Sequence, residues 1–262
     1  VDGVVGFSTY TVGIEEKDAE PRSSDIDELT AGINFSFFGD KNEIKYGLEM
    51  KSIRTDFQFI NPFGNRFKDE QNTTELGFYF KYRHIFGNLI IDPSIRTQYY
   101  SALGSVTLEP RLGLKYNIND KLRLKVAAGR FTQNILSTSN ERDVVNLFNG
   151  FLTGPESPVT GLDGNFVKNK LQQSYHGVAG FEYDLTKNIQ LNIEGYYKDF
   201  PQLIVVNRNQ VDKNETDYVV ETGKAYGVDF TLKYEVPRIY IWATYSHGYV
   251  NRNDGEQIYP TI

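Results

Sequence analysis

The stretch LEPRLGLKYNINDKLRLKVAAGRF, residues 108–131, decides how the fold is interpreted. On both sides of the polar run 117–120, leucines and valines alternate with charged residues. Alternation with a period of two is typical of β-strands, because successive side chains of a strand point to opposite faces of the sheet. The stretch therefore predicts a β-hairpin with a tight turn at 117–120, one apolar face and one charged face.

The same alternation recurs along the chain and predicts eleven strands. In ten of them, from the second onward, every second residue forms a face without charge, although charged residues make up 24% of the chain. Lipid explains such a face, because Lys or Arg at the bilayer midplane costs roughly 2–4 kcal/mol. The opposite face carries many charges, for which a wide lumen has room. The predicted strands lie near residues 4–13, 28–38, 43–55, 73–86, 89–100, 105–116, 121–133, 172–185, 189–200, 223–235 and 238–250.

The connections alternate between tight turns and mostly long polar loops. This alternation is typical of outer-membrane barrels, which have short periplasmic turns and longer extracellular loops. The sequence predicts an all-β fold, an antiparallel transmembrane β-barrel. The predicted long connections include 15–27, 56–72, 134–170 and 201–222.

An odd number of strands would leave two unpaired edges, which hydrocarbon does not tolerate. We therefore expect residues 1–262 to form a partial outer-membrane β-barrel domain, completed by a longer polypeptide or by other chains.

Composition and motifs argue against several functions. The net charge of -6 and the pI of about 5.2 argue against nucleic acid as a partner. The absence of cysteine excludes disulfides and thiolate metal sites. We find no nucleophile elbow, zinc-binding motif, phosphate loop or dinucleotide fingerprint, so we expect no catalytic residue, no cofactor and no enzymatic activity. No metal site is expected either, because His84, His176 and His247 lack metal-ligand spacing and the run 251–256 lacks the spacing of a calcium loop.

The connection 134–170 is the candidate functional segment. It contains Phe148, Phe151 and Phe166 among Asn and Gly residues, and a purely solvated loop has no need of such side chains. Long loops inside ordered domains are usually functional. We predict that these three residues contact a ligand or a partner, with packing on neighbouring loops as the alternative.

Four segments resemble consecutive hairpins of TonB-dependent outer-membrane receptors, most closely those of Bacteroidota. The resemblance is strong over roughly the last 160 residues and extends to the first 105 only as a pattern. Its residues include Pro110-Arg111, Gly129-Arg130-Phe131 and Tyr226-Gly227-Val228-Asp229. The segments are LEPRLGLKYNINDKLRLKVAAGRFTQ (108–133), GFEYDLTKNIQLNIEGYYKDFPQLI (180–204), GKAYGVDFTLKY (223–234) and IWATYSHGYVNRNDGEQIYP (241–260).

The resemblance implies a barrel of about 22 strands around a plug domain, of which this chain is roughly the middle to later half. It implies outer-membrane lipid and TonB with its inner-membrane motor as partners, and import of a ligand by energised plug movement. The alternative is a non-transporting docking barrel in a secretion or glycan-capture complex, with a surface lipoprotein as a possible partner. A soluble all-β binding module or hydrolase is the third interpretation.

Four arginines, placed on the lumenal face, have two open interpretations. They could contact an anionic ligand, or they could pair with lumenal carboxylates such as Glu109 or with the plug. The residues are Arg96, Arg111, Arg123 and Arg130.

Overall fold

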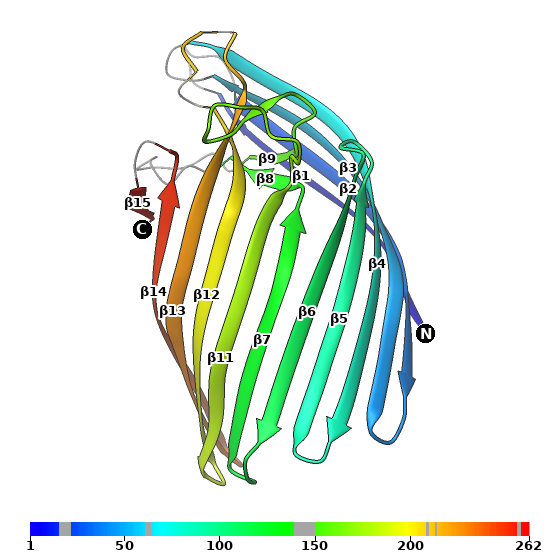
Figure 1. Cartoon of the computed structure of the whole chain (residues 1–262), viewed down its shortest axis with the longest axis vertical. Coiled ribbons are helices and arrows are strands. Elements are labelled where there is room, and N and C mark those ends of the chain that lie inside the picture. Colours follow the sequence, from blue (N-terminus) through cyan, green and yellow to red (C-terminus); the bar gives the residue numbers. More distant parts are fainter. Residues whose placement is uncertain are drawn as a thin grey trace.

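A computed structural model describes residues 1–15, 22–60, 64–138, 150–207, 210–212, 214–255 and 258–261. Thirteen of the described strands form one curved sheet, and twelve of them follow an order in which each strand pairs antiparallel with the next (Figure 1). The order is β1 (Asp2–Ile14), β2 (Arg22–Phe38), β3 (Asn42–Ile60), β4 (Arg66–Phe86), β5 (Leu89–Tyr100), β6 (Ser105–Asn117), β7 (Leu122–Gln133), β11 (Gln172–Thr186), β12 (Ile189–Val206), β13 (Tyr218–Val236), β14 (Ile239–Asn253) and β15 (Ile258–Thr261).

All eleven predicted strands are present, and four short strands were not predicted. β8 (Ile135–Ser137) pairs with β9 (Phe151–Thr153) in a separate two-stranded sheet. β10 (Val159–Thr160) adds to β13 in parallel, and β15 pairs with the end of β14. The described residues contain no helix long and apolar enough to cross a membrane.

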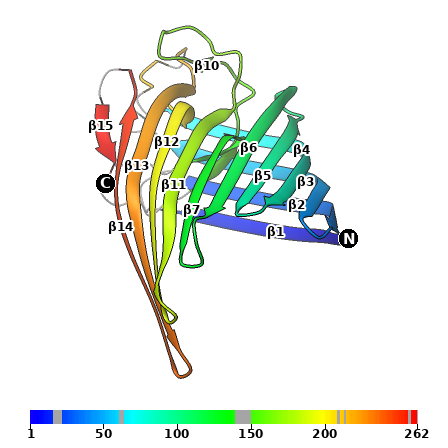
Figure 2. The ribbon, with the colours of Figure 1, turned by 60° about the horizontal axis from the view of Figure 1, so that its bottom comes forward.

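The sheet curls so that β2 and β3 pass behind β11 and β12 (Figure 2). Its convex face carries the uncharged positions. Leu112, for example, lies opposite Ala128, and Leu124 lies opposite Phe181. Many of these side chains are exposed, including Leu48, Leu76, Phe78, Leu112, Leu124, Val126, Phe230 and Leu232. The exposed apolar surface agrees with the predicted lipid-facing side.

The concave face carries a network of ion pairs. Lys115 and Lys125 lie directly opposite each other, a pairing of like charges that is unfavourable by itself. Glu182, on the next strand, receives both ammonium groups, at 3.3 Å and 2.7 Å. Arg123 binds Asp184 through two nitrogens at 2.8 Å each. The charges of this face therefore neutralise one another across three neighbouring strands.

Glycines on the concave face leave space for tyrosine rings that lie across the strands. A Cβ on Gly47 would come within 2.7 Å of the ring of Tyr79, whose hydroxyl donates to Asn34 over 2.8 Å. A Cβ on Gly227 would come equally close to the hydroxyl of Tyr196, which also reaches Gly248. Each tyrosine thus crosses the glycine of a middle strand. Tyr79 links β4 to β2 across β3, and Tyr196 links β12 to β14 across β13.

Four strands are much longer than a membrane crossing requires. β3, β4, β12 and β13 have 19, 21, 18 and 19 residues, whereas a spanning strand needs about 9–11. Their extensions lie at the end of the sheet with the long connections, which we call the mouth. The prediction that 56–72 and 201–222 are entirely loops is wrong, and so is the predicted start of the second strand near 28, because β2 begins at Arg22.

The pattern changes at the mouth because the surroundings of the strands change. Along the end of β3, the inward positions are Ile53, Thr55, Phe57 and Phe59, all buried, and Arg54 and Asp56 point outward. Below the mouth, the apolar residues face outward instead. Above the lipid, water faces the outer surface, so the hydrophobic effect favours the reverse orientation.

Candidate functional site

The hydrophobic core of the described chain lies inside the mouth. It joins the extensions of β3, β12 and β13 to the connection between β7 and β11, and the ends of the long strands meet there (Figure 1). We call this cluster the mouth core. Its buried members are Phe57, Phe59, Leu136, Leu152, Val159, Ile204, Tyr218 and Val220.

The connection enters the mouth because β7 separates from β6. Their ladder ends at Arg111 opposite Gly129, although β7 continues to pair with β11 as far as Gln133. Beyond that point Glu109, only 2% exposed, accepts hydrogen bonds from the backbone N–H of Thr132 at 2.8 Å and from its hydroxyl at 2.6 Å. The carboxylate thus replaces a backbone acceptor, and β7 can lead into β8.

The β8–β9 hairpin is held against the inner side of β2, β3 and β4. The N–H of Phe151 donates to the Ser24 hydroxyl over 3.0 Å, and the Thr153 hydroxyl donates to Gln71 over 2.8 Å. A Cβ on Gly150 would come within 2.6 Å of the Phe57 ring. The hairpin therefore packs closely, with buried polar groups matched to partners.

The connection then crosses to the other wall of the mouth. Val159, fully buried, lies opposite Tyr218 in the short parallel pair of β10 and β13. The hydroxyl of Thr160 is 2.7 Å from that of Thr216. The connection between β7 and β11 thus contacts β2, β3 and β4 on one wall of the mouth and β13 on the other. These strands are far apart in the strand order.

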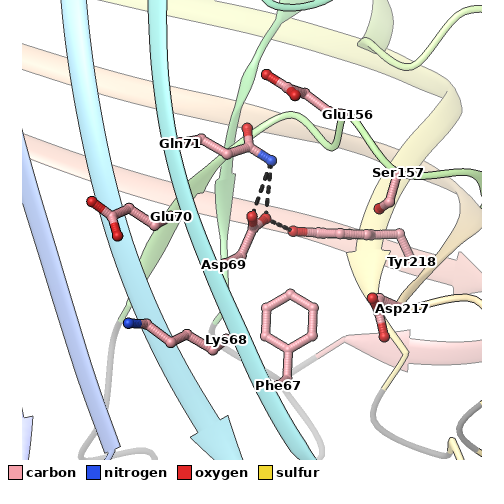
Figure 3. Close-up of a pocket in the computed structure, with 9 residues that line it drawn as sticks. All are labelled: Phe67, Lys68, Asp69, Glu70, Gln71, Glu156, Ser157, Asp217 and Tyr218. Carbon is pink, nitrogen blue, oxygen red and sulfur yellow. Dashed lines mark hydrogen bonds between the residues drawn. The ribbon is translucent and has the colours of Figure 1, made fainter.

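A cavity of about 260 Å³ opens beside this bridge (Figure 3). The Tyr218 hydroxyl donates to the Asp69 carboxylate, which also accepts two bonds from Gln71 at 3.0 Å and 3.2 Å. The Phe67 ring meets the Tyr218 ring edge-on at 5.6 Å. The lining residues are Phe67, Lys68, Asp69, Glu70, Gln71, Glu156, Ser157, Asp217 and Tyr218.

The electrostatics of the cavity are acidic. Four of its lining residues are carboxylates and one is a lysine. Burial raises the pKa of the Tyr218 phenol well above its usual range, and the nearby charge of Asp69 raises it further. Tyr218 lies beyond the membrane-spanning part of β13, and its hydroxyl stays a hydrogen-bond donor at neutral pH. The cavity can accept hydrogen bonds from a ligand, and its carboxylates favour a ligand that carries positive charge.

The predicted contact residues occupy different positions. Phe148 lies outside the described residues. Phe151 is partly buried, with its ring 5.8 Å from that of Tyr10. Phe166 is 67% exposed, in a bridge with Thr160. Phe151 therefore packs against β1, and Phe166 is exposed to solvent.

The arginines mostly have carboxylate partners. Arg96 pairs with Glu49 at 3.0 Å and Arg111 with Glu109 at 2.7 Å, and Arg123 binds Asp184 as described. Arg130 is different, because it lies opposite Tyr175, whose ring is exposed on the convex face. The prediction that Arg130 faces the lumen is wrong. Its guanidinium donates instead to Gln173 and to the carbonyl of Leu108.

The three histidines contact aromatic side chains at the strand ends. His84 lies against Phe86, with ring centroids 4.0 Å apart, and His176 lies 4.5 Å from Phe131. His247 is within 3.2 Å of the Tyr249 hydroxyl. In the described parts of the chain, no group of three or more His, Asp or Glu residues could hold a metal ion.

Asp69, Gln71, Asp217 and Tyr218 were not predicted as site residues. They lie in stretches that were interpreted as loops. The alternation of Phe57, Phe59 and Phe67 with polar residues was the available signal for an extended strand there, although it does not reveal the partner wall.

Comparison with known proteins assigns the chain to a family. The model of the family "TonB dependent receptor-like, beta-barrel" matches residues 5–261. The chain belongs to this family. It is therefore an outer-membrane protein, and the mouth is its extracellular end. No curated protein sequence matches the chain.

Solved structures of receptors and transporters share the fold. A mutant form of the ferric enterobactin receptor PfeA from Pseudomonas aeruginosa has a TM-score of 0.63 at 12% identity, covering 95% of this chain and 43% of that chain. The FrpB iron transporter from Neisseria meningitidis gives 0.59 at 13%, covering 92% and 37%. The outer-membrane transporter YddB from Escherichia coli gives 0.56 at 12%, covering 95% and 39%. The chain thus spans well under two thirds of these proteins.

Proposed function

We propose that this chain forms part of the wall and mouth of a TonB-dependent transporter, which imports a ligand across the outer membrane by energised plug movement. TonB and its inner-membrane motor are the partners that this proposal requires. The family assignment supports it, and so do structural neighbours named as receptors and transporters.

The observation that carries the proposal is the division of the sheet into two surfaces. The convex surface is apolar, and the concave surface carries ion pairs such as Arg123–Asp184 and Lys125–Glu194. A barrel with such an interior holds water or a polar plug, because unpaired charges are costly in an apolar core. A polar lumen of this kind suits passage of a hydrophilic ligand.

We further propose that residues 1–262 are a partial barrel domain of a barrel of about 22 strands, with the plug domain and closing strands elsewhere. The coverage of the solved receptors supports this organisation. The resemblance of the hairpins in 108–133 and 180–204 favours a receptor of the Bacteroidota type.

The ligand is proposed to meet the chain at the extracellular mouth. Phe166 is the exposed aromatic there, and the cavity beside Tyr218 supplies hydrogen-bond acceptors. Phe148 and Phe151 belong to the same connection and complete the proposed contact set.

A strain lacking the gene tests the proposal through uptake of labelled ligands. A panel of ferric chelates is a suitable start, because two of the structural neighbours are named for ferric enterobactin and iron. Uptake of one ligand should require the gene, and deletion of TonB should abolish it to the same extent. Gene-dependent uptake that persists without TonB would contradict energised transport.

The alternative is a docking barrel that does not transport a ligand. The observation that favours it is the mouth core, which fills part of the extracellular mouth with packed side chains. A surface lipoprotein or a larger outer-membrane complex would then be the partner. Crosslinking and purification from the membrane should recover that partner in stoichiometric amount, and gene-dependent uptake of a ligand would exclude this alternative.

A further inference from the structure

The start of β13 and the upper part of β4 meet across the mouth, although five strands separate them in the sheet. The Tyr218 hydroxyl donates to the Asp69 carboxylate, and the Tyr218 ring packs against Phe67. Tyr218 is 1% exposed, so its side chain is almost entirely shielded from solvent. Hydrogen bonds to an ionised acceptor are stronger than neutral ones, particularly in such surroundings.

A second contact joins the same two walls. The side-chain amide of Asn65, just before β4, donates to the carbonyl of Gln210 at 3.0 Å and to that of Val211 at 3.2 Å. Gln210 and Val211 precede β13. The two walls therefore touch directly at two levels, without the connection between β7 and β11 as an intermediary.

Asp69 also couples the two walls to this connection. Gln71 donates to Asp69 and accepts from Thr153 of β9. Val159 of β10 lies opposite Tyr218. A change at the contact between Asp69 and Tyr218 thus reaches β4, β13 and both short strands.

We propose that Asp69 and Tyr218 form a clasp that holds the extracellular mouth closed over the lumen, and that the mouth opens when this contact is released. Loops and edges of a protein open locally at a lower free energy than the whole fold. The membrane-spanning ladders stay intact in such an opening, because the clasp lies beyond them.

The cavity shows how a ligand could act on the clasp. Asp69 and Tyr218 themselves line it. A ligand group that donates hydrogen bonds, such as an ammonium or guanidinium group, would compete with Tyr218 for the Asp69 carboxylate. This step rests on the proposed function, whereas the clasp itself does not.

A cysteine reporter tests the clasp in intact cells, because the chain has no cysteine of its own. Val159→Cys places a thiol in the mouth core at a fully buried position. The measurement is its rate of reaction with a maleimide that cannot cross membranes. Tyr218→Phe removes the hydroxyl and keeps the ring, so it should raise that rate by roughly ten- to a hundredfold, the effect expected for loss of a hydrogen bond to a charged group.

Two controls separate opening from general loosening. Tyr226→Phe removes a hydroxyl from the lipid-facing side of the same strand and should leave the rate unchanged. A Phe166→Cys reporter, at an exposed position, should react equally fast with and without Tyr218→Phe. Adding Asp69→Asn to Tyr218→Phe should raise the Val159→Cys rate little beyond the single change, because Asn keeps an acceptor for Gln71 and the contact with Tyr218 is already lost.

The proposal fails if Tyr218→Phe leaves the Val159→Cys rate unchanged. It also fails if the buried reporter already reacts as fast as Phe166→Cys in the otherwise unaltered protein. A faster reaction accompanied by loss of the heat-resistant folded barrel on a gel would show that Tyr218 only supports the fold. None of these outcomes depends on transport, so they are distinguishable from failure of the proposed function.

Discussion

The backbone N–H of Thr132 donates to the carboxylate of Glu109 over 2.8 Å, beyond the point where the ladder between β6 and β7 ends. Glu109 also pairs with Arg111 at 2.7 Å. A single buried side chain therefore completes the hydrogen bonding of a strand that leaves its neighbour. This arrangement directs the connection between β7 and β11 into the mouth.

Glu109→Ala should lower the free energy of unfolding by about 1–3 kcal/mol, because a buried N–H and the Thr132 hydroxyl lose their acceptor. The measurement is heat unfolding of the purified barrel in detergent. Glu235→Ala is the matched control, since Glu235 lies beside a short turn with its side chain 60% exposed. Equal stability of the two variants would show that Glu109 does not stabilise the fold as the acceptor for Thr132.

Gly227→Ala should destabilise the barrel by about 1–3 kcal/mol through overpacking. The new methyl group would come within 2.5 Å of the carbonyl of His247 and 2.7 Å of the Tyr196 hydroxyl. Gly177→Ala serves as the control, because a Cβ there meets nothing within 4 Å. Urea unfolding of both variants checks the difference, and a Gly227→Ala protein as stable as Gly177→Ala would show that Tyr196 does not lie across this glycine.

Arg123 and Asp184 should show a coupling free energy of about 1–2 kcal/mol, since both terminal guanidinium nitrogens reach the carboxylate and the pair is partly buried. A double-mutant cycle with Arg123→Met and Asp184→Asn measures it. Additive effects of the two substitutions on unfolding would mean that the ion pair contributes nothing of its own.

Leu124→Arg should impair assembly in the membrane far more than Lys125→Leu. The first change places a charge among lipid tails, at a cost of roughly 2–4 kcal/mol near the midplane. The second leaves Glu182 its bond to Arg123. The amount of folded, heat-modifiable barrel in outer membranes is the measurement, and similar losses for both variants would argue against the assigned faces.

The spanning part of the fold could be predicted from the sequence because lipid imposes a strict rule on one face. Leu112, Leu124 and the other alternate positions on the lipid-facing side of the spanning strands carry no charge. The alternation therefore predicted both the strands and the face of each strand that meets lipid. At the mouth, water and protein replace lipid, and the rule lapses. The extended ends of β3 and β4 were consequently interpreted as loops.

The candidate site was harder to predict for a different reason. Asp69 and Tyr218 are 149 residues apart in the chain. Their meeting depends on the curvature of the whole sheet, which local patterns do not contain. Packing was one of the two interpretations that the apolar residues of 134–170 allowed, although Phe151 and Phe166 showed no sign of which would be buried.

The most direct test of the account is a series of single spin labels along β7, from Leu122 to Ala128, in the protein reconstituted in lipid. The measured quantity is the collision rate of each label with oxygen, which concentrates in the bilayer. Labels at Leu122, Leu124, Val126 and Ala128 should show high rates, and those at Arg123, Lys125 and Ala127 low rates. The opposite phase, or no alternation along the strand, would contradict an outer-membrane barrel with its charges in the lumen.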